Sequence, residues 1–161
     1  MRVTLIRHGE AGEDAPRDEL RALTLKGRAA VARVGRSLRR RGGDFTAVVA
    51  SPYVRALQTA EMVAAEVGYG GLVAVSEALV PEARVSQAVA LLISLAAEPS
   101  VAFVAHEPIL SSLAGALLGR GRFPSLRKGE ALRLRLPEGP EKPGGELRWR
   151  IDPDTGDREL T

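Results

Sequence analysis

Cysteine is absent from the 161 residues of this chain, and aromatic residues make up only 4% of it. The lack of cysteine excludes disulfides, thiolate zinc ligands and a thiol nucleophile. The few aromatic rings make a base-stacking platform hard to build, so we do not expect a nucleic-acid partner. No apolar run approaches the roughly 18 residues that a membrane span requires, and the opening residues do not resemble a signal peptide. We therefore expect a cytoplasmic protein with no membrane partner.

Lysine is also scarce, so arginine supplies nearly all of the positive charge in a chain whose net charge is +3. A guanidinium offers a planar fork of N–H donors that matches a phosphate group, which favours a phosphorylated ligand. A basic chain is also compatible with nucleic acid, with an acidic protein surface, or with a genome-wide preference for arginine. The composition therefore suggests anion binding without fixing the anion.

Short apolar runs alternate with amphipathic stretches over the first 118 residues. The runs that predict buried strands cover residues 3–6, 46–50, 72–75 and 101–105. Helices are expected to begin at or near Thr24, Ser51, Val85 and Pro108. Such alternation is typical of a three-layer α/β/α sandwich with a mostly parallel central sheet. Neither a repeat nor a linker interrupts the pattern, so residues 1–161 should form a single domain.

The last thirty residues follow a different pattern, in which apolar and charged residues alternate. This alternation predicts an antiparallel hairpin of half-buried strands, joined by the Pro/Gly-rich loop 137–146. It also places four arginines on one face, namely Arg133, Arg135, Arg148 and Arg150. That face is either solvated and neutralised by nearby acids, or it docks an acidic partner.

Polar groups suited to anions follow three of the predicted strands. The first strand ends at Arg7, His8 and Gly9, the second is followed by Arg55, and the fourth ends at His106. Ligands of open parallel sheets bind at the carboxyl ends of the strands, where helix N-termini add free N–H groups. We therefore expect two arginines and two histidines to converge on one pocket for a dianion.

An imidazole can attack phosphorus when one ring nitrogen is held as a donor and the other is free. His8 is the candidate nucleophile, and the positive charge of Arg7 favours its neutral form. Gly9 should let the backbone pass close to the phosphate. His106, if protonated, should donate a hydrogen bond to a phosphoryl oxygen.

Each of these residues also has a structural interpretation. Ser51 most simply caps a helix, because no histidine neighbours it in a nucleophile turn. A metal site built from the two histidines with Glu10 or Glu107 lacks the spacing of known motifs, so no metal is expected.

Four segments, in this order and at these spacings, resemble the signatures of the histidine phosphatase superfamily, which has the phosphoglycerate mutase-like fold. They are LIRHGE (5–10), LTLKG (23–27), SPYVRALQTA (51–60) and VAHEP (104–108). The resemblance implies that His8 is phosphorylated transiently and that Arg7, Arg55 and His106 hold the phosphoryl group without metal or cofactor.

Within that superfamily the short chain is similar to phosphohistidine phosphatases of the SixA type. The segments HEPILS (106–111), KGEA (128–131) and GGELRW (144–149) carry this similarity. It implies a phosphohistidine-bearing protein as substrate, and the short segment between residues 75 and 101 should leave the pocket open to one. A small-molecule phosphomonoesterase of the same superfamily and a non-catalytic phosphate-binding adaptor are the alternatives.

The general acid is not fixed by the sequence. Glu77, just past the third strand, matches the superfamily position best, while Glu82, Glu13 and Asp14 compete with it. The P–N bond of phosphohistidine is labile, so a weakly placed acid should cost such an enzyme little.

Overall fold

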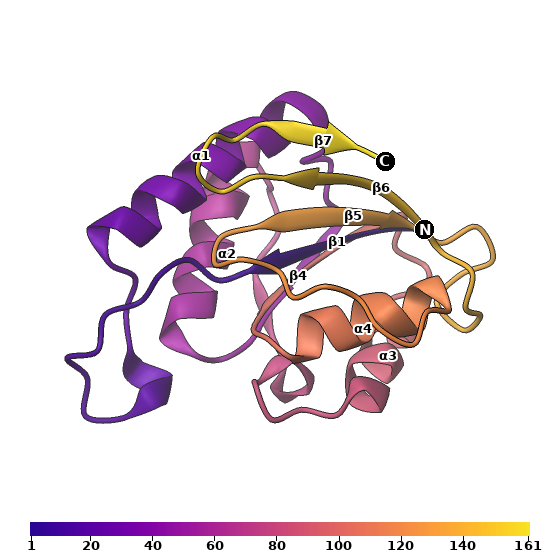
Figure 1. Cartoon of the computed structure of the whole chain (residues 1–161), viewed down its shortest axis with the longest axis horizontal. Helices are drawn as coiled ribbons and strands as arrows, with labels where there is room; N and C mark the ends of the chain where they lie inside the picture. Colours follow the sequence, from indigo (N-terminus) through magenta and orange to yellow (C-terminus); the bar gives the residue numbers. More distant parts are fainter.

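The computed structural model describes residues 1–161 and contains one seven-stranded sheet (Figure 1). The strands are β1 (Arg2–Arg7), β2 (Ala47–Ala50), β3 (Ala74–Val75), β4 (Ser100–Ala105), β5 (Ala131–Arg135), β6 (Glu146–Ile151) and β7 (Arg158–Leu160). Their order across the sheet is β3-β2-β4-β1-β5-β6-β7. The neighbours among β1 to β4 are parallel, whereas β5, β6 and β7 pair antiparallel. The predicted α/β class is confirmed, and the short edge strand β7 is an addition to it.

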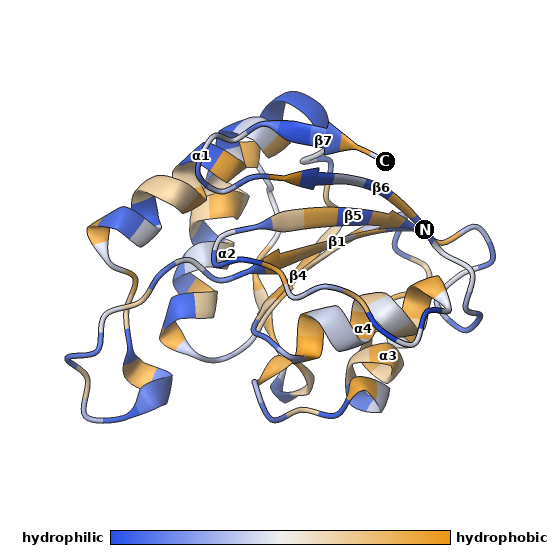
Figure 2. Cartoon of the chain, in the orientation of Figure 1, coloured by the Kyte–Doolittle hydropathy of each residue, from blue (hydrophilic) through white to orange (hydrophobic).

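Four helices cover the two faces of this sheet. They are α1 (Leu25–Arg41), α2 (Val54–Val67), α3 (Val85–Ser94) and α4 (Ile109–Leu118), and two short 3-10 helices are η1 (Asp18–Leu20) and η2 (Glu77–Leu79). On one face, α1 and α2 share an apolar cluster with Ile6, Val104 and Trp149. On the other face, α3 and α4 share a cluster with Leu5 and Phe103. The result is the expected three-layer sandwich, with its apolar strands in the middle (Figure 2).

Two helix ends follow directly from the local sequence. The Thr24 hydroxyl accepts a hydrogen bond from the N–H of Gly27 at 2.9 Å and so caps α1. At the C-terminal end of α4, Gly119 adopts a φ of 69°, a left-handed conformation that favours glycine. None of the helices is both long and apolar enough to cross a membrane.

The start of α2 differs from the prediction. Helix α2 begins at Val54, and its N-cap residue Tyr53 has no side-chain cap. Ser51 accepts a hydrogen bond from the N–H of Tyr53 at 3.3 Å but lies outside the helix. This later start places Arg55 in the first turn of α2 and leaves Ser51 at the end of β2, next to the fourth strand.

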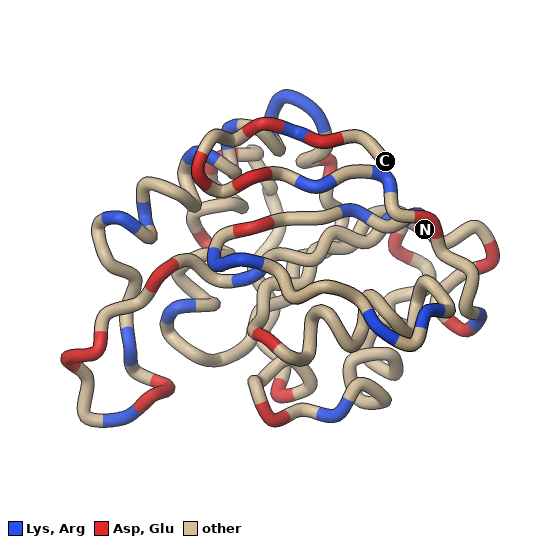
Figure 3. Tube along the Cα trace, viewed as in Figure 1, with Lys and Arg blue, Asp and Glu red and all other residues tan.

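The prediction of four arginines on one face of the hairpin holds for Arg133, Arg135 and Arg148, which line one surface pocket, and is wrong for Arg150. A register shift between β5 and β6 sets Arg133 opposite Trp149 and Arg150 opposite Leu132, so Arg133 and Arg150 lie on different faces. Arg133 is only 6% exposed and lies over the Trp149 ring, while Arg150 reaches Glu130 on the other side. Arg135 and Arg148 both form ion pairs with Glu146, and residues of both charges lie along this part of the chain (Figure 3).

Candidate active site

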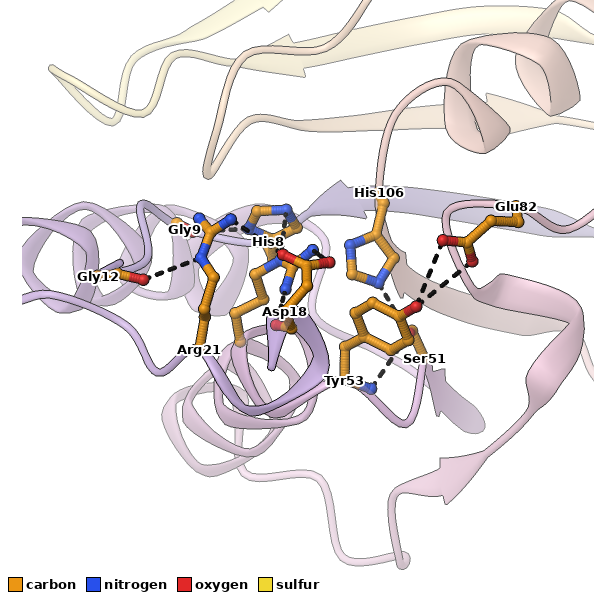
Figure 4. A network of polar contacts seen from close by, with 10 residues as sticks. His8, Gly9, Gly12, Asp18, Arg21, Ser51, Tyr53, Glu82 and His106 are labelled. Carbon is orange, nitrogen blue, oxygen red and sulfur yellow. Dashed lines mark hydrogen bonds and ion pairs between the residues drawn. The ribbon is translucent and has the colours of Figure 1, made fainter. Parts of the chain in front are cut away.

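Strand register brings the two histidines of the chain together. Arg7, the last residue of β1, pairs with Ala105, the last residue of β4, so His8 and His106 follow neighbouring strand ends. Their ring centroids are 5.0 Å apart and their planes are tilted by 57°. Figure 4 shows both rings with Ser51 and Tyr53, which follow β2 at the same edge of the sheet. The predicted proximity of His8 and His106 is confirmed.

A pocket of about 220 Å³ opens at this edge. Its lining residues are Arg7, His8, Asp18, Arg21, Arg55, Pro81, His106, Glu107 and Lys128. Four of them carry positive charge and two are carboxylates, so the pocket has a net positive charge. Its size and charge suit a small anion presented from outside.

The contacts of His8 fix its tautomer. Nδ1 lies 2.7 Å from the carbonyl oxygen of Gly9, which can only accept, so Nδ1 carries the hydrogen. Nε2 then has a free electron pair, which accepts a hydrogen bond from Nε of Arg55 at 3.3 Å. Burial, together with the charges of Arg55 and Arg7, lowers the pKa of His8 to about 4. The ring is therefore neutral at physiological pH, with its lone pair directed at Arg55.

His106 is also buried and neutral. Its Nε2 lies 2.8 Å from the Ser51 hydroxyl, and its ring packs edge-to-face with that of Tyr53, with the two ring centroids 5.0 Å apart. The other nitrogen, Nδ1, is buried without a partner and lies on the side of the ring that faces His8 (Figure 4). Burial and the nearby His8 and Arg55 lower the pKa of His106 to about 3. In the empty pocket His106 is thus neutral, unlike the protonated form considered from the sequence.

The two predicted arginines differ in how they are held. Arg7 donates from Nη1 to the carbonyl of Leu126 at 2.7 Å, and its Nε is buried without a partner. Arg55 is 5% exposed and its guanidinium lies 5.0 Å from the centre of the Tyr53 ring. Burial lowers the pKa of Arg7, with further repulsion from Arg55, although Glu107 and Glu130 oppose the shift. Both guanidinium groups line one small pocket, so each gains from a bound dianion.

Asp18 and Arg21 belong to the pocket although the sequence did not single them out. Asp18 Oδ2 accepts from Arg55 Nη2 at 3.1 Å, and Asp18 Oδ1 accepts from Arg21 Nη1 at 3.0 Å. Burial opposes ionisation of Asp18, but the hydrogen bonds and charges of Arg55 and Arg21 outweigh it and lower its pKa. Asp18 begins η1 and Arg21 follows it, in a polar stretch of sequence whose lack of periodicity does not indicate where the side chains point.

Gly9 has a different role from the one expected. Its N–H already donates to the hydroxyl of Thr59 at 3.2 Å, and it does not line the pocket. A Cβ at this position would lie 2.8 Å from a methyl group of Val31 and 3.0 Å from the carbonyl of Gly27. The glycine therefore allows close packing of the segment after β1 against α1.

The four carboxylates considered as the general acid do not line the pocket. Glu77 is exposed in η2, and Glu13 and Asp14 are exposed in the loop that precedes η1. Glu82 accepts from the Tyr53 hydroxyl at 3.4 Å, which places it near the rim (Figure 4). The assignment of Glu77 as the acid stays a prediction without support from these contacts.

The carboxylates considered as metal ligands have other partners. Glu10 accepts from the Thr24 hydroxyl at 2.9 Å, close to the start of α1. Glu107 accepts from the Ser111 hydroxyl at 2.5 Å and from the N–H of Leu126 at 3.2 Å. No group of three or more histidine, cysteine or carboxylate side chains is placed to hold a metal ion.

Comparison with known proteins shows what the chain is similar to. Residues 3–80 match the model of the histidine phosphatase superfamily (branch 1). The protein histidine phosphatase SixA complexed with tungstate is 27% identical, with a TM-score of 0.88 over 96% of this chain and 98% of that one. A putative phosphohistidine phosphatase SixA from Agrobacterium tumefaciens is 22% identical, with a TM-score of 0.74 over 85% and 95% of the two chains.

The fold is also that of enzymes acting on small phosphate esters. A mycobacterial glucosyl-3-phosphoglycerate phosphatase is 17% identical, with a TM-score of 0.69 over 91% of this chain and 96% of that one. No curated protein sequence matched the chain. The residues that match the superfamily model include Arg7, His8, Asp18, Arg21 and Arg55, which all line the pocket. This chain is a phosphatase whose residues 3–80 match the histidine phosphatase superfamily and whose fold is that of the SixA structures.

Proposed function

We propose that this enzyme hydrolyses phosphohistidine on a protein through a phosphoryl group carried transiently by His8. The observation that carries this proposal is the fixed tautomer of His8, whose Nδ1 donates to the Gly9 carbonyl at 2.7 Å. This hydrogen bond leaves the Nε2 lone pair in a cationic pocket and keeps the ring from rotating. A neutral, oriented imidazole is a competent nucleophile toward phosphorus.

In the first step, the Nε2 lone pair of His8 forms a bond to phosphorus. The electron pair of the scissile bond goes to the leaving nitrogen of the substrate imidazole, which is protonated on its distal nitrogen and so departs as a neutral ring. Arg55 shifts its Nε–H from Nε2 of His8 to a phosphoryl oxygen, and Arg7 binds another oxygen with its unpartnered Nε. The phosphoryl group is thereby held by two guanidiniums while it moves between two nitrogens.

His106 stabilises the same transition state from the opposite side. When the Ser51 hydroxyl donates to Nε2, the hydrogen of the neutral ring sits on Nδ1, the buried nitrogen on the His8 side. Nδ1 then donates to a phosphoryl oxygen without any need for a positive charge. The negative charge of a bound phosphoryl group also raises the pKa of His106, which strengthens this contact.

In the second step, water attacks phosphorus and the P–N electron pair returns to Nε2 of His8. Both protons of the water leave on inorganic phosphate, so the neutral ring and its Nδ1–H are regenerated. No proton has to pass through a dedicated acid, which is consistent with the absence of Glu77 from the pocket lining.

The shape of the site favours a substrate presented on another protein. The whole segment between β3 and β4 contributes only Pro81 to the pocket lining, so no roof closes over it. The similarity to SixA structures supports the same substrate class. A small phosphomonoester is the alternative substrate. The cytoplasmic location that the sequence predicts is also part of this proposal.

The test compares kcat/KM on a chemically phosphorylated, phosphohistidine-bearing protein with kcat/KM on sugar and nucleotide phosphates. We expect the protein substrate to be preferred and the variant His8→Ala to lose all turnover while still binding tungstate. A preference for the small esters would establish the phosphomonoesterase instead. Binding of phosphate without turnover of either substrate would identify an adaptor.

A further inference from the structure

Asp18 lines the pocket and is hydrogen-bonded to Arg55, whose guanidinium is proposed to bind the oxygens of the phosphoryl group. Besides the contact of its carboxylate with Nη2 of Arg55, its carbonyl oxygen accepts from Nη1 at 2.8 Å. Arg21 holds the second carboxylate oxygen at 3.0 Å. These three hydrogen bonds fix a negative charge inside an otherwise cationic site (Figure 4).

Asp18 does not have to leave when a phosphoryl group binds. A guanidinium carries five N–H groups, and His8 and Asp18 together occupy three of those on Arg55. The remaining N–H groups are available to phosphoryl oxygens. Asp18 and the substrate can therefore share the same guanidinium, which places the carboxylate next to the reacting group.

The direction of attack puts the leaving group on the side where Asp18 is open to solvent. His8 is 5% exposed and lies at the base of the pocket. In an in-line displacement the leaving group departs opposite the attacking Nε2, which is toward the mouth. The side chain of Asp18 is 52% exposed, so its carboxylate reaches that mouth.

A fixed carboxylate at this place suits a leaving imidazole and not a leaving alkoxide. A phosphoimidazole that is protonated on its distal nitrogen loses a neutral imidazole, because the P–N electron pair neutralises the ring. A carboxylate that accepts a hydrogen bond from the distal N–H stabilises this reactive form. A phosphate ester instead places negative charge on oxygen, which an ionised carboxylate can neither protonate nor stabilise.

We propose, on the basis of the proposed function, that Asp18 is a specificity-determining residue that accepts a hydrogen bond from the distal nitrogen of the leaving imidazole and so selects P–N over P–O substrates. The lowered pKa of Asp18 agrees with this role, because it keeps the carboxylate ionised.

Neighbouring carboxylates are less suited to this role. Both oxygens of Glu107 are bound, one by the Ser111 hydroxyl and one by the N–H of Leu126, and they support the segment before β5. Glu82 does not line the pocket and contacts the Tyr53 hydroxyl. Asp18 is the pocket carboxylate that combines attachment to Arg55 with access to the mouth.

The test uses Asp18→Asn, which keeps an oxygen for Arg55 but removes the charge, and measures kcat/KM on a phosphohistidine-bearing protein and on p-nitrophenyl phosphate. We expect the ratio of the two values to fall about tenfold or more, since a charge-assisted hydrogen bond is lost only with the imidazole substrate. The inhibition constant of inorganic phosphate should fall at least about threefold, because the variant lacks the negative charge that repels the bound anion. The variant Asp18→Glu, which retains the charge, should recover part of the ratio.

The matched control is Asp157→Asn, at an exposed carboxylate outside the pocket, and it should leave both rates unchanged. Equal loss with both substrates in Asp18→Asn would overturn the selectivity role and leave the proposed function intact. A wild-type enzyme without activity on phosphohistidine would overturn both.

Discussion

The Nε–H of Arg55 lies 3.3 Å from Nε2 of His8, and each of the two side chains is 5% exposed. His8 follows β1 and Arg55 lies in the first turn of α2, so the contact joins two segments whose strands, β1 and β2, are separated in the sheet by β4. It orients the nucleophilic nitrogen in the free enzyme and supplies a donor for the phosphoryl group in the reaction.

Replacing Arg55 by lysine should reduce kcat/KM by about 100-fold. A lysine keeps the charge but loses the planar fork, so it cannot contact Nε2 of His8, Asp18 and a phosphoryl oxygen together. Lost hydrogen bonds to charged groups account for a change of this order. Steady-state kinetics check it, with Arg36→Lys at an exposed position on α1 as the control. A reduction of less than about threefold would show that charge alone suffices.

The two histidines should remain neutral well below the usual pKa of an imidazole. The pKa values of His8 and His106 are lowered to about 4 and about 3, mainly by burial. Proton NMR of the ring C–H groups should show no titration between pH 8 and pH 5. A midpoint near 6.5 for either ring would contradict the assignment of His8 as a neutral nucleophile.

The same shifts predict a loss of stability in acid. Between the ordinary histidine pKa near 6.5 and the folded value of about 4, the unfolded chain binds protons that the folded His8 does not. The free energy of unfolding therefore falls as the pH drops through this window and levels off below it for this group. Urea unfolding across pH 7 to 4 measures the effect. The variant His8→Asn should show a weaker dependence than the wild type, and an identical slope would argue against a buried neutral ring.

Gly9→Ala should destabilise the protein by roughly 1–3 kcal/mol, the range for overpacking a filled interior. The new methyl group would press on Val31 and on the carbonyl of Gly27 in α1. Gly121→Ala, where a Cβ meets nothing within 4 Å, is the matched control. Urea unfolding of the two variants gives the comparison. Equal free energies of unfolding for the two variants would contradict the packing role of Gly9 and favour the role at the phosphate that the sequence predicts.

Much of the site could be predicted because it sits at the ends of strands. Runs of apolar residues fix where β1 and β4 stop, and parallel pairing then places His8 beside His106. Asp18 could not be found in this way, because it reaches Arg55 from the short 3-10 helix η1, whose polar sequence shows no periodicity. The late start of α2 was also not predicted, because a serine followed by a proline is typical of a helix N-terminus. The Ser51 hydroxyl instead forms a hydrogen bond with Nε2 of His106.

The hairpin shows the limit of alternation as a guide. A single register shift between β5 and β6 changes which residues face the core, and no feature of the sequence predicts this shift. Arg133 was expected on a face that is either solvated or docked to an acidic partner. It is instead buried against Trp149, where it donates to the Thr4 hydroxyl at 3.0 Å and to the carbonyl of Gly42.

Arg133→Ala should therefore cost roughly 3 kcal/mol, since it removes buried hydrogen bonds and the packing on Trp149. Arg135→Ala should cost less than about 0.5 kcal/mol, because that side chain is 58% exposed. Denaturant unfolding distinguishes the two. Equal effects would support the solvated face instead.

The central claim, that His8 carries the phosphoryl group, is tested most directly by trapping the phosphoenzyme. A protein labelled with radioactive phosphate on histidine is mixed with the enzyme and quenched within milliseconds to seconds under alkaline conditions. The account predicts label that is stable in base, labile in acid and located by mass spectrometry on His8. Label on His106 or on Ser51, or rapid turnover by His8→Ala, would contradict it.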